Sequence, residues 1–297
     1  MGVRRVVLAL LCALLMDVPT QSGLAAGPLE KPAGGEIATR VAAGGETARL
    51  GGRVVDIWRP SGSGAAPIII FSHGYLGCGR QSTFLTQALA DAGYLVVAPQ
   101  HADSLCGRHL SPPEVPFWQP QDWSDSTYRD RRDDIVAVIA ALHRDPVFAG
   151  KIDWTKLGLM GHSLGGYTVL GLAGAWPNWR IPDVKAVVAL SPWCLPFLLA
   201  GGDLGSVTAP VEYQGGTDDF AITPTVSMPG GCYDATKPPA AYVEFQGAGH
   251  LAWTDLVPTD HADMVFYVRA FFDAWLRGKS AEPLRTRHDD VTDLRVK

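Results

Sequence analysis

The sequence predicts an α/β fold in which a mostly parallel central sheet carries helices on both faces. Two continuous apolar runs, residues 68–71 and 94–98, are typical of strands that are covered on both sides. The segment between them, 81–92, has apolar residues at helical spacing, and this order predicts a right-handed parallel crossover. The chain has 297 residues, of which 47% are hydrophobic, so we expect one domain with a large core.

The amino end has the pattern of a cleaved secretory signal. Arg4 and Arg5 precede the apolar run 6–16, and small residues follow it at 23, 25 and 26. A bilayer needs about 20 apolar residues, which makes a retained membrane anchor the weaker alternative. We therefore expect residues 1–26 to be a signal peptide, the protein to be secreted or periplasmic, and no stable membrane span.

The rest of the chain alternates strands and helices. Residues 27–50 show no clear periodicity, and 52–58 alternate like an edge strand. The proline- and tryptophan-rich segment 99–127 is a loop of a length that is usually functional or mobile. Further predicted elements are helices over 128–144, 167–175 and 261–276, and strands over 156–160, 184–190, 209–214 and 241–246. We expect a catalytic domain over 27–280 and a polar tail over 281–297.

Four cysteines lie beyond the signal segment, at Cys78, Cys106, Cys194 and Cys232. An even number in an oxidising compartment indicates disulfides, and three pairings are possible. Each cysteine follows a predicted strand, and we favour Cys78 with Cys106 and Cys194 with Cys232. The spacing lacks the paired C-x-x-C of a zinc site, so we expect no metal and no cofactor.

The hexapeptide Gly-His-Ser-Leu-Gly-Gly at 161–166 joins a predicted strand to a predicted helix. A serine at the apex of such a turn has a strained backbone, and its hydroxyl stands clear of the sheet. Gly161 and Gly165 lie where the strand and the helix pass too closely for a Cβ. The alternative is a flexible loop with a capping serine. The strand and the helix on either side favour Ser163 as a nucleophile.

A serine hydroxyl needs a base to take its proton and an acid to orient that base. Asp218 and Asp219 follow one predicted strand, and His250 follows the next. Successive residues leave a strand on opposite sides, so only one of the two aspartates can point at the histidine. The sequence thus predicts the triad Ser163, Asp219 or Asp218, and His250.

These residues resemble the α/β-hydrolase superfamily over about 53–276. The motifs are Phe-Ser-His-Gly-Tyr at 71–75, the hexapeptide at 161–166, Gly-Gly-Thr-Asp-Asp-Phe at 215–220 and Gly-Ala-Gly-His at 247–250. Within the superfamily they are similar to bacterial dienelactone-hydrolase-like esterases, platelet-activating-factor acetylhydrolase-like enzymes and polyester-cleaving cutinases. True dienelactone hydrolases use a cysteine nucleophile, and the serine in this hexapeptide argues against that activity.

The resemblance implies roles for further residues. It selects Asp219 as the acid, and it makes the backbone N–H groups of Tyr75 and Leu164 the oxyanion hole. Tyr75 is expected either to line the substrate cleft, as the equivalent aromatic residue does in the polyester-cleaving relatives, or to pack on its own loop. Because their segment leaves the catalytic edge of the sheet, Trp118 and Trp123 are expected to line the cleft, although they could instead pin the long loop. His73 and His162 are expected to support the loops structurally.

The predicted function is a secreted serine carboxylic-ester hydrolase that forms an acyl-enzyme and acts on short to medium acyl or polyester-type esters. The alternatives are a lipase, a phospholipid esterase of the platelet-activating-factor acetylhydrolase type, or a catalytically silent binding protein. Residues 192–208 are too few for a large lid domain. A net charge of −5 without a basic cluster argues against nucleic acid, so the expected partner is a small or polymeric ester, and a monomer is expected.

Overall fold

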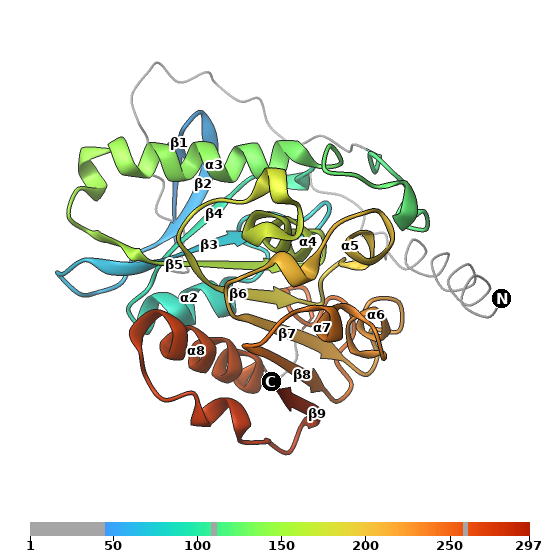
Figure 1. Ribbon diagram of the computed structural model, residues 1–297. Coiled ribbons are helices and arrows are strands. Elements are labelled where there is room, and N and C mark those ends of the chain that lie inside the picture. The colour runs from blue at the N-terminus through green and yellow to red at the C-terminus, as the bar shows by residue number, and fades with distance from the viewer. Residues whose placement is uncertain (1–44, 108–111, 258–260) are drawn as a thin grey trace, which may run out of the picture.

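The computed structural model describes residues 45–107, 112–257 and 261–297 (Figure 1). The expected signal segment 1–26 and residues 27–44 lie outside the described residues. The described strands form one sheet in the order β1-β2-β4-β3-β5-β6-β7-β8-β9. Their bounds are β1 Glu46–Leu50, β2 Arg53–Trp58, β3 Ala66–Ser72, β4 Leu95–Pro99, β5 Ile152–His162, β6 Val184–Leu190, β7 Val211–Gly216, β8 Ala240–Phe245 and β9 Val291–Val296.

The six central strands, β3 to β8, run parallel to their neighbours within that group. The strands β1, β2 and β9 add antiparallel edges. Loops that leave the carboxyl ends of parallel strands meet at the same edge of a sheet, and in such folds ligands bind there. The predicted triad residues all follow strands of this central group.

Helices cover both faces of the sheet (Figure 1). They are α2 Thr83–Asp91, α3 Arg129–Arg144, α4 Leu164–Leu170, α5 Leu195–Leu199, α6 Thr223–Ser227, α7 Cys232–Ala235 and α8 Ala262–Arg277. Side chains of β3 alternate between two cores: Ile68 and Ile70 pack toward the side of α3 and α4, and Ile69 and Phe71 toward α2 and α8. The α/β-hydrolase architecture that the sequence predicts is confirmed.

Two segments differ from the sequence prediction. Residues 46–50 belong to the segment 27–50, which shows no clear periodicity, but pair with β2. Residues 291–296 belong to the expected polar tail but pair with β8. Leu284 and Val291 of the tail are also buried. The expected polar tail over 281–297 is therefore part of the sheet and of the core. An edge strand needs only one buried face, so its charged residues resemble those of a loop.

Two disulfides tie loops to the sheet edge. Cys78 bonds to Cys106 and Cys194 to Cys232, with Cα atoms 5.8 Å and 6.4 Å apart, which is the pairing that the sequence favours. The segment between β6 and β7 forms only α5 and a short 3₁₀ turn, so it is no large lid, as predicted. Within the described ranges, no helix has the length and apolar character that crossing a membrane requires.

Candidate active site

Ser163 lies at the apex of a tight turn between β5 and α4. Its backbone angles are φ 54° and ψ −116°, a left-handed conformation that is uncommon for a residue other than glycine. A Cβ added to Gly161 would lie 2.2 Å from the carbonyl oxygen of Gly165, and one added to Gly165 would lie 1.9 Å from that of Ser72. The strained turn and the close strand–helix approach that the sequence predicts are confirmed.

The histidine and the acid meet at this serine. His250 Nε2 is 2.9 Å from Ser163 Oγ, and on the other side of the ring His250 Nδ1 is 3.3 Å from Asp219 Oδ1. Asp219 is 3% exposed, whereas Asp218 is exposed and contacts the Thr217 hydroxyl. The structure thus brings Ser163, His250 and Asp219 together and leaves Asp218 in the surface turn.

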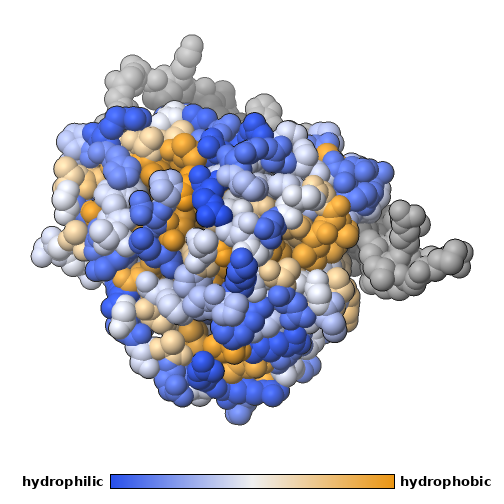
Figure 2. Space-filling model, viewed as in Figure 1, coloured by the Kyte–Doolittle hydropathy of each residue, from blue (hydrophilic) through white to orange (hydrophobic). Residues whose placement is uncertain are grey.

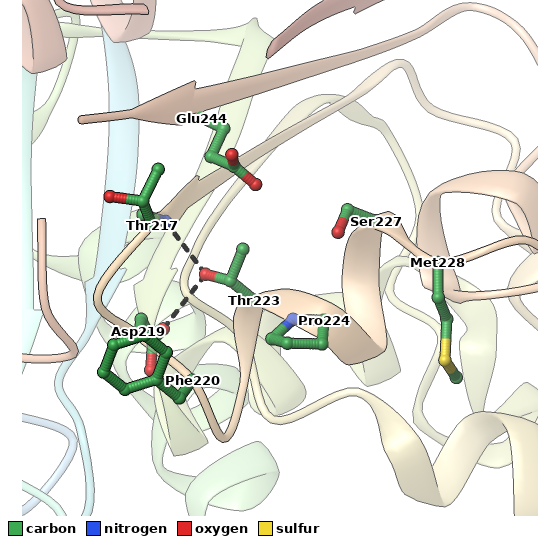
Figure 3. Close-up of a pocket in the computed structure, with 9 residues that line it drawn as sticks. Thr217, Asp219, Phe220, Thr223, Pro224, Ser227, Met228 and Glu244 are labelled. Carbon is green, nitrogen blue, oxygen red and sulfur yellow. Dashed lines mark hydrogen bonds between the residues drawn. The ribbon is translucent and has the colours of Figure 1, made fainter. Parts of the chain in front are cut away.

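Hydroxyl groups hold the Asp219 carboxylate. Ser191 Oγ and Thr223 Oγ1 both donate to Asp219 Oδ2, the latter at 3.3 Å. The Thr223 oxygen also accepts from the Gly216 amide at 2.9 Å, so it stands between the end of β7 and the carboxylate (Figure 3). Burial acts to raise the pKa of Asp219, but its contacts with His250 and Ser191 outweigh burial and lower the pKa. The carboxylate is therefore ionised at neutral pH.

Ser191 is a site residue that the sequence analysis missed. It follows β6, which lies between the strand that precedes Ser163 and the strand that precedes Asp219. Its side chain is fully buried, and Ser191 Oγ is 2.8 Å from His250 Nδ1. The rule that identified the aspartates and the histidine, a polar residue after a central strand, would have identified this serine as well.

His162 links the loop after β3 to the loop that carries His250. Burial, followed by the charge of His250, lowers the pKa of His162 to about 3, so the ring is neutral. Its Nε2–H donates to the His250 carbonyl at 2.8 Å, and its Nδ1 accepts from the Gln81 side-chain amide at 3.0 Å. The Gln81 oxygen in turn accepts from the Gly74 amide at 2.9 Å. The expected supporting role of His162 fits these contacts.

Arg131 of α3 holds the loop after β3 from within the protein. Its guanidinium is fully buried and makes a two-pronged ion pair with Asp103, at 2.7 Å and 3.1 Å. It also donates to the carbonyls of His73 and Gly74, at 2.7 Å and 3.1 Å. Burial acts to raise the pKa of Asp103, but the adjacent guanidinium outweighs it, so the pair is ionised. The sequence analysis did not find this residue.

The Gly74 carbonyl fixes the direction of the next amide. It accepts from Arg131 and, at 2.7 Å, from the neutral ring of His73. In a trans peptide the N–H points opposite to the C=O, so the Tyr75 N–H points away from Arg131. A Cβ added to Gly74 would lie 3.5 Å from the Cβ of Ser163. The loop therefore packs directly beside the serine.

The expected cleft tryptophans differ in exposure. Trp123 is 2% exposed, and its ring packs against other aromatic rings, namely Phe117, Tyr128, Tyr167 and Trp193. The interpretation of Trp123 as a cleft residue is therefore wrong, because the ring is enclosed in the core and pins the long loop. Trp118 is 51% exposed. Tyr75 is partly buried, with its ring 5.4 Å from that of Phe117.

Apolar side chains are exposed next to the triad. Leu251 follows His250 and is 44% exposed, and Phe220 follows Asp219 and is 63% exposed. Figure 2 shows that apolar patches interrupt the polar surface of the face in view. Phe220 also borders a pocket of about 270 Å³ beside β7 and β8, together with Pro224 and Met228 (Figure 3). The surroundings of the triad therefore suit an apolar ligand.

The contacts at Ser163 meet the needs of nucleophilic catalysis: a hydroxyl, a base within hydrogen-bond reach and an acid behind the base. Among the described residues, no group of three or more His, Cys, Asp or Glu side chains is placed to hold a metal ion.

The chain is similar to a family of hydrolases and to several proteins named cutinases. A family model described as PETase, PET hydrolase-like, matches residues 35–280. Cutinase est2 of Thermobifida alba is 28% identical over 201 residues, which are 66% of this chain and 56% of the relative. Cutinase 2 of Thermobifida cellulosilytica and cutinase cut1 of Thermobifida fusca are each 27% identical over 207 residues, 66% of this chain. The matches cover 64% and 53% of those two relatives, so the chain spans less than two thirds of each.

Proposed function

Because the chain belongs to the PET hydrolase-like family, whose model matches residues 35–280, we propose that it is a secreted serine carboxylic-ester hydrolase. The observation that carries the proposal is the 2.9 Å contact between Ser163 Oγ and His250 Nε2, with the ionised Asp219 on the far side of the imidazole. Such a contact allows the imidazole to remove the serine proton as the hydroxyl attacks.

The reaction proceeds in two halves. Ser163 Oγ attacks the ester carbonyl while His250 takes its proton, and the imidazolium then protonates the departing alcohol. An acyl group is left on the serine. His250 next activates a water molecule, which releases the acid and restores the hydroxyl. Asp219 keeps its negative charge throughout and stabilises the imidazolium.

The backbone N–H groups of Tyr75 and Leu164 form the proposed oxyanion hole. Leu164 directly follows the nucleophile, and the Tyr75 amide belongs to the loop that Arg131 and His73 hold beside Ser163. Removal of one donor of this kind typically costs about 3 kcal/mol of transition-state stabilisation.

The proposed substrates are short to medium acyl esters or polyester-type esters. The relatives are named cutinases. Two structural features support such substrates here: the short segment between β6 and β7, and the exposed Leu251 and Phe220 beside the triad. An open site accepts an extended chain without first uncovering itself. Trp118 remains a proposed cleft residue because its ring is exposed.

Compartment and assembly are also proposed. The two disulfides support an oxidising location, either outside the cell or in the periplasm. We propose a signal peptide over 1–26, a catalytic domain from residue 27 and a monomeric enzyme.

The test is hydrolysis of p-nitrophenyl esters of rising chain length, measured beside phospholipid and polyester film, with Ser163→Ala as the control. We expect turnover of the shorter esters that the control lacks. The rate should follow substrate concentration smoothly through the solubility limit, because the described segment between β6 and β7 is too short to form a large lid that must open. A sharp rise once droplets form would indicate a lipase, and preferred cleavage of phospholipid would favour the phospholipid esterase. Folded wild-type protein without any turnover would favour the silent binding protein.

A further inference from the structure

We propose that Ser191 is a positioning residue of the catalytic site and that its hydroxyl connects Asp219 to His250. The inference rests on the proposed function of the triad. Ser191 Oγ is 2.8 Å from His250 Nδ1, whereas the two Asp219 oxygens are 3.3 Å and 3.4 Å from that nitrogen. The same hydroxyl contacts Asp219 Oδ2. Of these three contacts at His250 Nδ1, the one with Ser191 Oγ is therefore the shortest, and the hydroxyl bridges the imidazole and the carboxylate beside their direct contact.

The direction of each hydrogen bond follows from the number of protons. A hydroxyl has one proton to donate, and an ionised carboxylate can only accept. The Ser191 proton therefore points to Asp219, and Ser191 Oγ can only accept from His250. Nδ1 of the imidazole must then carry a hydrogen, which leaves the Nε2 lone pair facing Ser163 Oγ at 2.9 Å. Ser191 thus selects the tautomer in which His250 can act as a base.

The backbone keeps the hydroxyl in place. The Ser191 amide donates to the Gln214 carbonyl of β7 at 2.8 Å, and the residue adopts φ 41°, in the left-handed region. Its side chain is fully buried, so water does not compete for its two partners. Thr223 donates to the same carboxylate oxygen, at 3.3 Å. Because Asp219 keeps that donor when the Ser191 hydroxyl is removed, we expect a Ser191→Ala variant to fold.

The hydroxyl acts mainly in the transition state. When His250 takes the Ser163 proton, its Nδ1–H becomes part of a cation, and the bond to Ser191 becomes stronger because charge-assisted hydrogen bonds exceed neutral ones. An interaction that is stronger in the transition state raises kcat rather than lowering KM. Ser191→Ala should therefore lower kcat by about 10- to 100-fold, as expected for the loss of a hydrogen bond to a charged group.

The experiment is a double-mutant cycle on a soluble p-nitrophenyl ester. We would measure kcat and KM for the wild type, Ser191→Ala, Asp219→Asn and the double variant. KM of Ser191→Ala should stay within about twofold of the wild type. Adding Ser191→Ala to Asp219→Asn should lower kcat by no more than about twofold, because the path to the carboxylate is already broken.

The control variant is Thr236→Val. Thr236 is 2% exposed, and its hydroxyl contacts Tyr213 and the Cys232 carbonyl, away from the triad. It should retain wild-type kcat, which separates the effect of Ser191 from the general effect of removing a buried hydroxyl. Ser191→Gly is a second test variant, because glycine suits the left-handed backbone and also lacks the hydroxyl. Ser191→Gly should lose kcat to the extent expected for Ser191→Ala. If the alanine variant folds poorly, the glycine variant still tests the inference.

Two outcomes would overturn the inference: a folded Ser191→Ala or Ser191→Gly variant with wild-type kcat, or equal fold losses in the wild-type and Asp219→Asn backgrounds. The second outcome would show that the serine acts independently of the carboxylate. Failure of the proposed function would look different, because the wild type would then hydrolyse no ester or Ser163→Ala would be as active as the wild type.

Discussion

At the residue scale, the loop after β6 holds Ser163 in its strained conformation. The Ser163 amide donates to the Leu190 carbonyl, and the Ser163 carbonyl accepts from the Trp193 amide, both at 3.0 Å. These bonds anchor both sides of the turn to the strand that Ser191 follows. The hydroxyl thus faces His250 with little freedom, and such pre-organisation lowers the barrier to reaction.

The two adjacent aspartates give a matched pair of variants. Asp219→Asn should lower kcat strongly, by about 10⁴-fold in comparable triads, because the amide no longer stabilises the correct histidine tautomer. Asp218→Asn should stay close to wild type, since the Asp218 side chain is exposed and contacts the Thr217 hydroxyl, and its bond to the Ala248 carbonyl is made by the backbone amide, which the substitution keeps. The rate of ester hydrolysis at neutral pH tests both variants. A strong loss in Asp218→Asn with little loss in Asp219→Asn would mean that the acid has been assigned to the wrong residue.

At the scale of the elements, α3 supports the oxyanion loop through Arg131. Arg131→Met would leave Asp103 as a buried, unpaired charge, and breaking such a pair typically costs about 3–5 kcal/mol of stability. Activity should fall too, because the Gly74 carbonyl loses a donor and the Tyr75 amide becomes less well directed. Urea unfolding and kcat measure the two effects separately.

The double variant Arg131→Met with Asp103→Leu separates stability from loop orientation. It removes both charges, so much of the stability should return. The kcat should remain low, because the carbonyls of His73 and Gly74 still lack the guanidinium. A double variant with wild-type kcat would show that Arg131 contributes to stability alone.

The elements differ in how well the sequence predicts them. The central strands β3 and β4 are apolar on both faces, and the sequence predicts them for that reason. The edge strand β2 is predicted from its alternation, but β1 and β9 are not, because they mix charged and apolar residues. The helices α5 to α7 are not predicted either, because they are short. Ser163 and His250 can be predicted because each follows a central strand, whereas the choice of Asp219 over Asp218 comes from the resemblance to the α/β-hydrolases. Arg131 could not be predicted, because its function depends on Asp103, 28 residues away, and on carbonyls that no motif identifies.

At the scale of the whole molecule, a buried acid makes stability depend on pH. Burial raises the pKa of Glu212 on β7 to about 8, although a hydrogen bond from Gln214 opposes the shift. Below about pH 4.5 the folded and unfolded chains both bind this proton. Between about pH 4.5 and about pH 8 only the folded chain keeps the Glu212 proton. The free energy of unfolding therefore falls with rising pH by up to about 1.4 kcal/mol per pH unit.

Glu212→Gln should remove this loss of stability with rising pH. We expect the variant to become progressively more stable than the wild type between pH 5 and pH 8, as measured by urea unfolding at several pH values. The control is Glu282→Gln, which changes an exposed glutamate and should leave the pH dependence as in the wild type. Parallel curves for the wild type and Glu212→Gln would show that Glu212 is ionised in the folded protein.

The central claim is that Ser163, activated by His250, is the nucleophile. The most direct measurement is labelling of the folded protein with a fluorophosphonate, followed by mass spectrometry of its peptides. We predict one covalent adduct on Ser163, none in Ser163→Ala and greatly slowed labelling in His250→Ala, because the members of a triad act as a unit. A wild-type protein that stays unlabelled, or an adduct that persists in Ser163→Ala, would contradict this claim.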